Sequence, residues 1–245
     1  MRAEQSLPVT FNRIPATLRK MRLDELLVAN SYVSSRSRAK FLIKAGYVVV
    51  NEKIVRKPSY IVKGDEEVKV LVEDRPLGYW KLKKIQESVE IIKKGDVVLD
   101  LGSSVGGFLI FASELADEVI GIEISEGFRE KLTKISEERG NVKVIFENVF
   151  DVPPKEIPEL DVILDDLTVE PEISIKALLR FLGRLKPEGR ALCVLKGVGA
   201  AETQRWLAEL ERQGLKLLKV IPSTKKEIYV VCEKQAMPEK QKTNK

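Results

Sequence analysis

Lys196 is the residue whose position most needs a chemical explanation. It ends an apolar run, Ala191 to Leu195, and glycines follow it at positions 197 and 199. A lysine is costly to bury, so an ammonium group at this point indicates either a side chain that reaches water or a functional site. The 245-residue chain contains no histidine. Acid–base chemistry must therefore use carboxylates, lysines, tyrosines or cysteines, and Lys196 is a candidate for it.

A glycine-rich turn, VLDLGSSVGGF, forms a second candidate site. It follows a predicted strand and opens a predicted helix, where backbone N–H groups suit a polar ligand and glycine lets that ligand approach. The nicotinamide fingerprint G-x-G-x-x-G would start at Gly102, but Ser104 stands in place of its second glycine. Glu123 ends the next predicted strand, 21 residues after Gly102. A carboxylate there can accept hydrogen bonds from both hydroxyls of a ribose.

The turn resembles motif I of the Rossmann-like methyltransferases that use S-adenosyl-L-methionine (SAM), through the pattern Asp100-x-Gly102-x-x-x-Gly106. This resemblance implies that the turn frames the methionine part of SAM and that Glu123 binds the ribose. It also implies that Asn148 touches the adenine, with Asp151 as an alternative. The cofactor-binding residues that it predicts are Asp100, Gly102, Ser103, Ser104, Gly106, Gly107, Phe108, Glu123, Ile124, Asn148 and Asp166.

Four further places resemble the FtsJ-like group of these enzymes, which methylates ribose 2′-oxygens of RNA. The segments GYWKLKKIQE, DVILDDL, CVLKG and STKKEIYVV follow the group's Lys…Asp…Lys…Glu order and supply Lys81, Asp166, Lys196 and Glu227. The resemblance covers residues from about 76 to 233. It implies that Lys196 is the general base, while the other three residues position it and the ribose. The group usually has serine or valine where this chain has Asp165.

Strand and helix patterns alternate after residue 87. The predicted strands are DVVLDL, EVIGIE, NVKVIF, DVILDD, ALCVLK, LKLLKVI and EIYVVCE, and the predicted helices are GGFLIFASELA, SEGFREKLTKISEERG, EISIKALLRFLGRL and AAETQRWLAELERQG. Such alternation favours a mainly parallel, doubly wound sheet. The predicted fold class is α/β: a Rossmann-like methyltransferase domain with a mostly parallel seven-stranded sheet, preceded by a small α+β domain.

Residues 21–72 predict that small domain as a helix–helix–hairpin unit. The second helix, within SSRSRAKFLIKAG, is expected to begin at a serine N-cap, to end at Gly46 and to expose its basic side chains. YVVVNEKIV predicts two strands joined by a turn at positions 51 and 52, and YIVKGDEEVKVLV predicts another strand pair around residues 63–65. The basic side chains expected to face solvent are Arg36, Arg38, Lys40 and Lys44.

This unit resembles the S4 RNA-binding domain, and its combination with an FtsJ-like domain is typical of the TlyA-type ribosomal RNA 2′-O-methyltransferases, historically called haemolysins. Residues 1–80 carry 15 Lys and Arg against 9 Asp and Glu, in a chain of net charge +5. A local basic surface indicates a polyanion partner, and ribosomal RNA or a ribosomal subunit is expected. The RNA-binding residues that the resemblance implies are Arg22, Ser37, Arg38, Lys40, Asn51 and Lys53.

The predicted organisation is an N-terminal arm (1–20), the S4 domain (21–72), a linker with the start of the catalytic domain (73–87), the methyltransferase domain (88–234) and a disordered tail (235–245). Cys193 and Cys232 are expected to be free buried thiols, and a cytoplasmic protein is expected. The sequence shows no metal-ligand spacing and no apolar run of the roughly 18 residues that span a membrane. Neither a metal nor a membrane partner is therefore expected.

Three other functions stay open. The first is a SAM- and RNA-binding ribosome-assembly factor without turnover, which an assay of methyl transfer would separate from an enzyme. The second is a membrane-active haemolysin, disfavoured because no amphipathic segment stands apart from the predicted cores. The third is a base methyltransferase, disfavoured because the chain lacks an Asn/Asp-Pro-Pro-Tyr motif and because Cys193 lies within a predicted strand.

Overall fold

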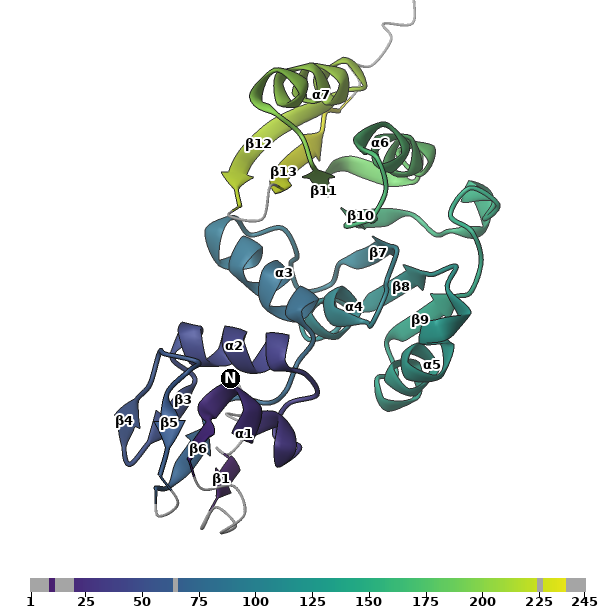
Figure 1. The fold of residues 1–245 in the computed structure, drawn as a ribbon. Coiled ribbons are helices and arrows are strands. Elements are labelled where there is room, and N and C mark those ends of the chain that lie inside the picture. Colours follow the sequence, from purple (N-terminus) through teal and green to yellow (C-terminus); the bar gives the residue numbers. More distant parts are fainter. Residues whose placement is uncertain (1–8, 12–19, 64–65, 224–226, 237–245) are drawn as a thin grey trace, which may run out of the picture. The chain divides into compact units, whose positions relative to one another are not determined.

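A computed structural model of the chain describes residues 9–11, 20–63, 66–223 and 227–236. The chain divides into two compact units, Met1–Leu77 and Gly78–Lys245 (Figure 1). Most of the predicted arm and residues 237–245 of the predicted tail lie outside the described residues. Among those residues, no helix has both the length and the apolar character to cross a membrane.

The first unit combines two helices with short strands. A sheet of order β1-β6-β3-β4 and a separate β2-β5 pair are antiparallel throughout. Its elements are β1 (Val9–Phe11), β2 (Met21–Arg22), α1 (Leu23–Ala29), α2 (Arg36–Ala45), β3 (Val48–Val50), β4 (Lys53–Ile54), β5 (Ile61–Val62) and β6 (Val68–Val70). Strand β1 falls within the predicted arm.

Helix α2 forms as the sequence predicts. The side chain of Ser35 caps it by accepting the backbone N–H of Arg38 at 3.3 Å, and Gly46 ends it with φ of 87°. One face of the helix is buried through Ala39, Leu42 and Ile43. The opposite face is thereby left to solvent, so charged side chains on it extend from a helix that is fixed by its buried face.

The predicted hairpin is present, with positive φ at both turn residues, Asn51 (44°) and Glu52 (65°). The second predicted strand pair is wrong. Strand β5 pairs with β2, and β6 pairs with β3 and β1, so the segments on either side of residues 63–65 do not pair with each other. β5 and β6 pair with strands distant in the sequence because this pairing buries Val62, Val68 and Val70.

The second unit is a seven-stranded sheet of order β12-β13-β11-β10-β7-β8-β9, in which β13 is antiparallel to both neighbours and the other described pairs are parallel. This confirms the predicted fold class. Its elements are α3 (Leu77–Ser88), β7 (Val97–Leu101), α4 (Gly107–Ala112), β8 (Glu118–Ile122), η2 (Glu126–Phe128), α5 (Arg129–Glu138), β9 (Val142–Ile145), η3 (Pro154–Glu156), β10 (Leu160–Asp165), α6 (Pro171–Arg180), β11 (Leu185–Lys196), α7 (Ala200–Arg212), β12 (Leu215–Pro222) and β13 (Glu227–Lys234).

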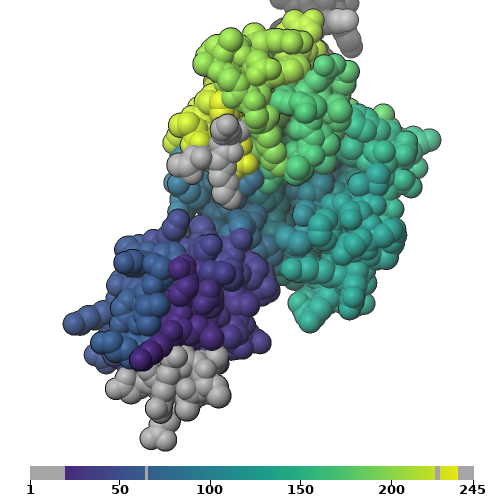
Figure 2. Space-filling view, in the orientation of Figure 1, coloured from purple at the N-terminus to yellow at the C-terminus, as the bar shows by residue number. Residues whose placement is uncertain are grey.

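Each face of this sheet has its own hydrophobic core. Helices α3, α4 and α5 pack on one face, where Leu82, Phe108 and Leu132 are buried. Helices α6 and α7 pack on the other, where Leu178 and Leu210 are buried. Figure 2 shows α7, in yellow-green, on the outside of this unit. Because both faces are covered, the edge formed by the strands' carboxyl ends is the place where polar chemistry can meet solvent.

Helices α3 and α4 approach each other closely through two glycines. A Cβ atom added to Gly107 would lie 2.7 Å from the backbone nitrogen of Tyr79 and 2.8 Å from the Cα of Gly78. Contacts this short are not tolerated, so only glycine fits at position 107 without a shift of α3. The packing matters for the site because α3 carries Lys81.

Candidate functional site

A cavity of about 410 Å³ lies at the carboxyl edge of the sheet. This volume is within the range of roughly 300–1,000 Å³ that small-ligand sites occupy. The chain order of the strands reverses between β7 and β10, and such switch points are where open α/β sheets bind ligands. The lining comes from the last residue of β8 and from residues after β7, β8, β9 and β10. It comprises Gly102, Ser104, Ile122, Glu123, Ile124, Phe128, Glu147, Asn148, Val149, Phe150, Asp166, Leu167, Thr168, Val169 and Ile173.

Positive φ angles shape the glycine-rich turn at the cavity. Gly102, Ser104 and Gly106 have φ of 78°, 50° and 80°. A Cβ atom on Gly102 would lie 2.6 Å from a side-chain carbon of Leu167 across the cavity wall. The absence of a side chain at position 102 therefore keeps the floor of the cavity open.

Glu123 is held by the same turn. One of its carboxylate oxygens accepts the backbone N–H of Ser104 at 2.7 Å, and the other accepts that of Ser125 at 2.8 Å. The side chain is fixed in direction, and each oxygen keeps a further lone pair. It can therefore accept two more hydrogen bonds from a diol within the cavity.

Asp100 lies buried beneath the turn. Its Oδ2 atom has no hydrogen-bond partner among the described residues. Burial, together with the charges of Asp166, Glu123 and Asp165, raises the pKa of Asp100 to about 7, although a hydrogen bond from Ser103 opposes the rise. The cavity above Asp100 is lined by the carboxylates of Glu123, Glu147 and Asp166. A buried, unpartnered carboxylate oxygen beneath such a lining fits a ligand that carries a cationic group, as SAM does.

The predicted cofactor-binding residues fall into two groups. The cavity lining includes Gly102, Ser104, Glu123, Ile124, Asn148 and Asp166. The other predicted residues, Asp100, Ser103, Gly106, Gly107 and Phe108, lie outside the lining and support the turn from below. Lining residues such as Phe128, Phe150 and Thr168 were not predicted, although positions just after predicted strands at this sheet edge could have indicated the last two.

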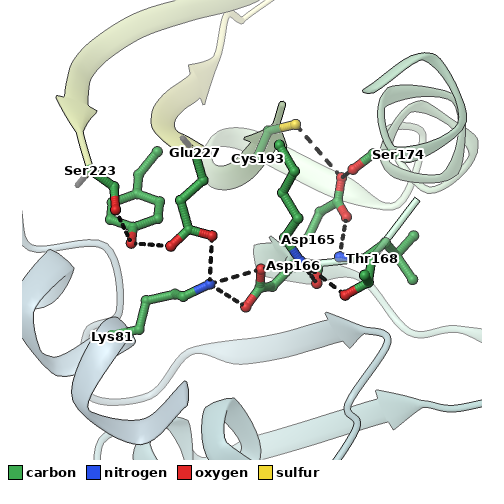
Figure 3. Close-up of polar contacts among 11 residues, drawn as sticks. Lys81, Asp165, Asp166, Thr168, Ser174, Cys193, Ser223 and Glu227 are labelled. Carbon is green, nitrogen blue, oxygen red and sulfur yellow. Dashed lines mark hydrogen bonds and ion pairs between the residues drawn. The ribbon is translucent and has the colours of Figure 1, made fainter. Parts of the chain in front are cut away.

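Lys81 joins two of the predicted catalytic carboxylates (Figure 3). Its Nζ atom donates to both carboxylate oxygens of Asp166, at 3.0 and 2.8 Å, and to Oε2 of Glu227 at 3.3 Å. These three residues come from α3, from the turn after β10 and from the first position of β13. All three side chains are less than a fifth exposed, so water screens the ion pairs only partly.

Lys196 reaches the same group from the end of β11. Its Nζ atom lies 3.0 Å from Oδ1 of Asp166, donates to the backbone carbonyl of Asp166 at 3.0 Å and donates to Oγ1 of Thr168 at 3.1 Å. Asp166 therefore bridges the two lysines. The structure brings together all four residues of the predicted tetrad, two amines and two carboxylates, beside the cavity.

Tyr229 is a member of this cluster that was not predicted. Its hydroxyl donates to Oε1 of Glu227 at 2.6 Å, and its ring lies 5.6 Å from Nζ of Lys81. Burial and the hydrogen bond to Glu227 raise the pKa of Tyr229 to about 12, so it stays a neutral donor. The alternation of a strand places residues two apart on one side, and that period could have indicated Tyr229 beside Glu227.

Asp165 points away from the tetrad into a buried polar cluster. Its Oδ2 accepts the hydroxyl of Ser174 at 2.7 Å and lies 3.6 Å from the thiol of Cys193, while Oδ1 accepts the backbone N–H of Leu167 at 3.2 Å (Figure 3). Burial raises the pKa of Asp165 to about 7 despite these hydrogen bonds, and the charge of Asp166 adds to the rise. Cys193 and Cys232 are free and buried, as predicted.

The predicted RNA-binding residues lie in the first unit. Ser37, Lys40, Asn51 and Lys53 are exposed. Arg22 is half-buried and donates to Asp24 at 2.9 Å. Burial pushes the pKa of the Asp24 carboxyl upward, but hydrogen bonds from Arg22 and Arg36 outweigh it and lower that pKa.

The prediction that Arg38 faces solvent is wrong. Its side chain is 11% exposed, and its Nε atom lies 2.7 Å from a carboxylate oxygen of Asp74. A second guanidinium nitrogen donates to the hydroxyl of Ser34. The acid that pairs with Arg38 lies 36 residues further along the chain, beyond the reach of a helix-period argument.

Comparison with known proteins identifies both units. Residues 21–68 match the S4 domain, and residues 75–235 match the FtsJ-like methyltransferases. The chain is 37% identical over 97 residues to YqxC of Bacillus subtilis, which its name describes as a candidate rRNA methyltransferase. That match covers 38% of this chain and 34% of YqxC, so the chain spans about a third of the length of this relative.

Two solved structures share the fold. A fibrillarin pre-rRNA processing protein of Methanococcus jannaschii has a TM-score of 0.58 and 23% identity, over 72% of this chain and 82% of its own. Fibrillarin of Aeropyrum pernix, crystallised with natively bound SAM, has a TM-score of 0.55 and 18% identity, over 69% of this chain and 79% of its own. At these identities the likeness establishes the fold. The FtsJ-like match, which spans more than half of the chain, confirms the resemblance seen in the sequence: the protein belongs to the FtsJ-like family of SAM-dependent methyltransferases and carries an S4 domain.

Proposed function

We propose that this protein transfers a methyl group from SAM to a ribose 2′-hydroxyl of ribosomal RNA, and that its S4 domain binds the RNA. The observation that carries the proposal is the meeting of Lys81, Asp166, Lys196 and Glu227 beside the cavity at the switch point of the sheet. A site with two amines and two carboxylates can orient a hydroxyl group and accept its proton without a metal or a histidine.

The cavity fits the cofactor. Glu123 would accept the ribose hydroxyls, and Asn148, which also lines the cavity, would contact the adenine. The buried carboxylate of Asp100, outside the lining, would complement the cationic methionine part through its charge. When bound, SAM supplies a methyl group on a sulfonium sulfur, which keeps the electron pair of the S–C bond when an oxygen nucleophile attacks the carbon.

Lys196 acts as the general base in this proposal. A 2′-hydroxyl is a weak nucleophile, and its proton moves to Nζ of Lys196 as the oxygen attacks; such a transfer supplies roughly 10²–10⁴-fold of rate. The carboxylate of Asp166 contacts both lysines, and its Oδ1 atom is shared between them. Glu227, fixed by Lys81 and Tyr229, completes the group that positions the ribose.

Ribosomal RNA is the substrate class that the relatives favour. YqxC is named for rRNA methylation, and the M. jannaschii protein for pre-rRNA processing. The S4 unit exposes Arg36, Lys40 and Lys53, basic side chains that suit contacts with phosphates. A ribosomal substrate would place the protein in the cytoplasm.

The test is methyl transfer from SAM with a deuterated methyl group to naked rRNA and to isolated ribosomal subunits, followed by mass spectrometry of the nucleosides. The proposal expects a labelled 2′-O-methylnucleoside. A label on a base would replace the ribose assignment with base methylation. SAM binding without label on any rRNA or subunit would favour the ribosome-assembly factor instead.

A further inference from the structure

The amine of Lys196 is positioned by the turn that follows β10. The backbone after Lys196 turns at Gly197, with φ of 71°, and the lysine side chain is 26% exposed. A long, flexible side chain of this kind needs fixed partners to keep one direction. All three oxygen atoms described around Nζ come from two residues of this turn, Asp166 and Thr168.

The three oxygens differ in what they do for a base. An ammonium group has three N–H donors, whereas the neutral amine that accepts a proton has two N–H groups and a lone pair. The carboxylate of Asp166 favours the charged form of a nearby amine. The carbonyl of Asp166 and the hydroxyl of Thr168 are neutral acceptors, and they can hold two N–H groups of Lys196 in either form.

The turn itself is anchored at both ends. Oδ1 of Asp165 accepts the N–H of Leu167, the residue before Thr168, and Oδ2 accepts the hydroxyl of Ser174 on α6. Figure 3 shows Thr168 on one side of this anchor and the Asp166–Lys81 pair on the other. Thr168 therefore presents its hydroxyl from a braced backbone, although its side chain is exposed at the rim of the cavity.

We propose that Thr168 is a positioning residue of the methyl transfer: its hydroxyl, with the carbonyl of Asp166, holds the neutral amine of Lys196 so that the lone pair points at the ribose hydroxyl. The inference rests on the proposed function and adds a residue to it. Since Thr168 acts on Lys196 rather than on a ligand, its loss lowers kcat and leaves the KM values for SAM and RNA near those of the wild type.

Thr168→Val tests this inference, because valine keeps the branched shape and removes the hydroxyl. We expect kcat to fall by at least about tenfold, since small misplacements of a catalytic group cost up to roughly 10²-fold. Thr168→Ser retains the hydroxyl and should restore most of kcat. Thr133→Val, at an exposed position on α5, makes the same exchange away from the site and should leave kcat unchanged.

The outcomes separate this inference from the proposed function. A wild-type protein that methylates no ribose contradicts the function itself. If the wild type is active, a Thr168→Val variant with normal kcat overturns the role of Thr168 and leaves the function standing. An increase in KM for SAM at unchanged kcat would also overturn it, because Thr168 would then be only a wall of the cavity.

Discussion

Lys196 and Asp165 end neighbouring strands of one sheet, but their side chains lie in different surroundings. Lys196 ends β11 with its amine among acceptors beside the cavity, while Asp165 ends β10 with its carboxyl in a buried polar cluster. β10 and β11 are parallel neighbours in which Asp165 pairs with Cys193. Lys196 follows Cys193 by three residues, so its side chain leaves β11 on the opposite face from that of Cys193. The side on which each side chain leaves its strand decides whether it meets substrate or core.

Lys196→Ala should abolish methyl transfer and leave SAM binding intact, because Lys196 is not among the residues that line the cavity expected to hold the cofactor. Isothermal titration with SAM, beside single-turnover transfer to RNA, measures both. Lys186→Ala is a matched control, since Lys186 also pairs with an aspartate, Asp161, which lies at the opposite end of β10 from Asp166. Near-normal transfer by Lys196→Ala would remove this residue from the mechanism.

Asp165→Asn should weaken the pH dependence of stability. The pKa of Asp165 is raised from its usual value near 4 to about 7. Its contribution to the free energy of unfolding is therefore complete below pH 4 and is lost as the pH rises through 7. Asparagine resembles the protonated acid, so the variant should avoid this loss, which is on the order of a few kcal/mol. Urea unfolding between pH 4 and 8 measures the difference.

Asp161→Asn is the control with the opposite sign, at the start of the same strand. Burial pushes the pKa of Asp161 upward, but the N–H of Val97 and the ammonium of Lys186 outweigh it and lower that pKa. Its stabilisation is present above pH 4 and fades as the pH falls through the lowered pKa. The variant should be destabilised at pH 7 and approach the wild type in acid. Parallel pH curves for the two variants would contradict this assignment.

At the scale of elements, buried strands were the most predictable feature and short exposed ones the least. β7, β8, β10 and the second half of β11 are largely apolar and have both faces covered, and such runs stand out in a sequence. β5 has two residues, and its partner is set by tertiary contacts. Helix α3 was not predicted as a helix, because its lysines interrupt the apolar period and Lys81 points into the site.

The same contrast holds for the site. Residues that follow strands could be placed at one edge of a parallel sheet from the sequence, and the tetrad was found there through its resemblance to a known pattern. Thr168 and Tyr229 were missed, since each joins the group only through a hydrogen bond to another of its side chains and neither has a distinctive motif. Arg38 was misjudged because its partner, Asp74, is remote in the sequence.

Gly107→Ala should disturb α3 and through it Lys81. The added methyl group would lie 2.7 Å from the backbone of Tyr79, and relief of such overpacking costs about 1–3 kcal/mol. A shift of α3 would separate Lys81 from Asp166 and Glu227. Activity should therefore fall even at temperatures at which the variant is still folded. Gly183→Ala is the control, since a Cβ atom there meets nothing within 4 Å. Full activity of Gly107→Ala would show that α3 need not pack this closely.

At the scale of the whole molecule, the excess positive charge and the candidate catalytic group lie on different units. The first 80 residues hold the excess of basic residues, whereas the remainder carries 27 Lys and Arg against 28 Asp and Glu. On α2, Arg36, Lys40 and Lys44 are exposed and follow one another at intervals of four residues, so they share one face. RNA affinity should therefore depend on the first unit and the chemistry on the second.

The double variant Lys40→Glu and Lys44→Glu should weaken RNA binding and leave SAM affinity unchanged. Each lost phosphate contact reduces the slope of log K against log salt by about one. Fluorescence anisotropy with an rRNA fragment at several salt concentrations measures affinity and slope together. Lys131→Glu with Lys216→Glu makes the same change in net charge on the second unit. Equal losses in both double variants would point to net charge rather than to the α2 face.

The reversed direction of β13 has a consequence for the order in which the protein is completed during synthesis. The other strands that serve the site offer residues at or beyond their last position, but β13 contributes Glu227 from its first. β13 also inserts between β11 and β12, which precede it in the chain. A nascent chain can assemble β7 to β11 while β12 still lacks its neighbour. Lys81 then has only one of its two carboxylate partners, Asp166, so the complete group of four side chains forms only after β13 has been synthesised.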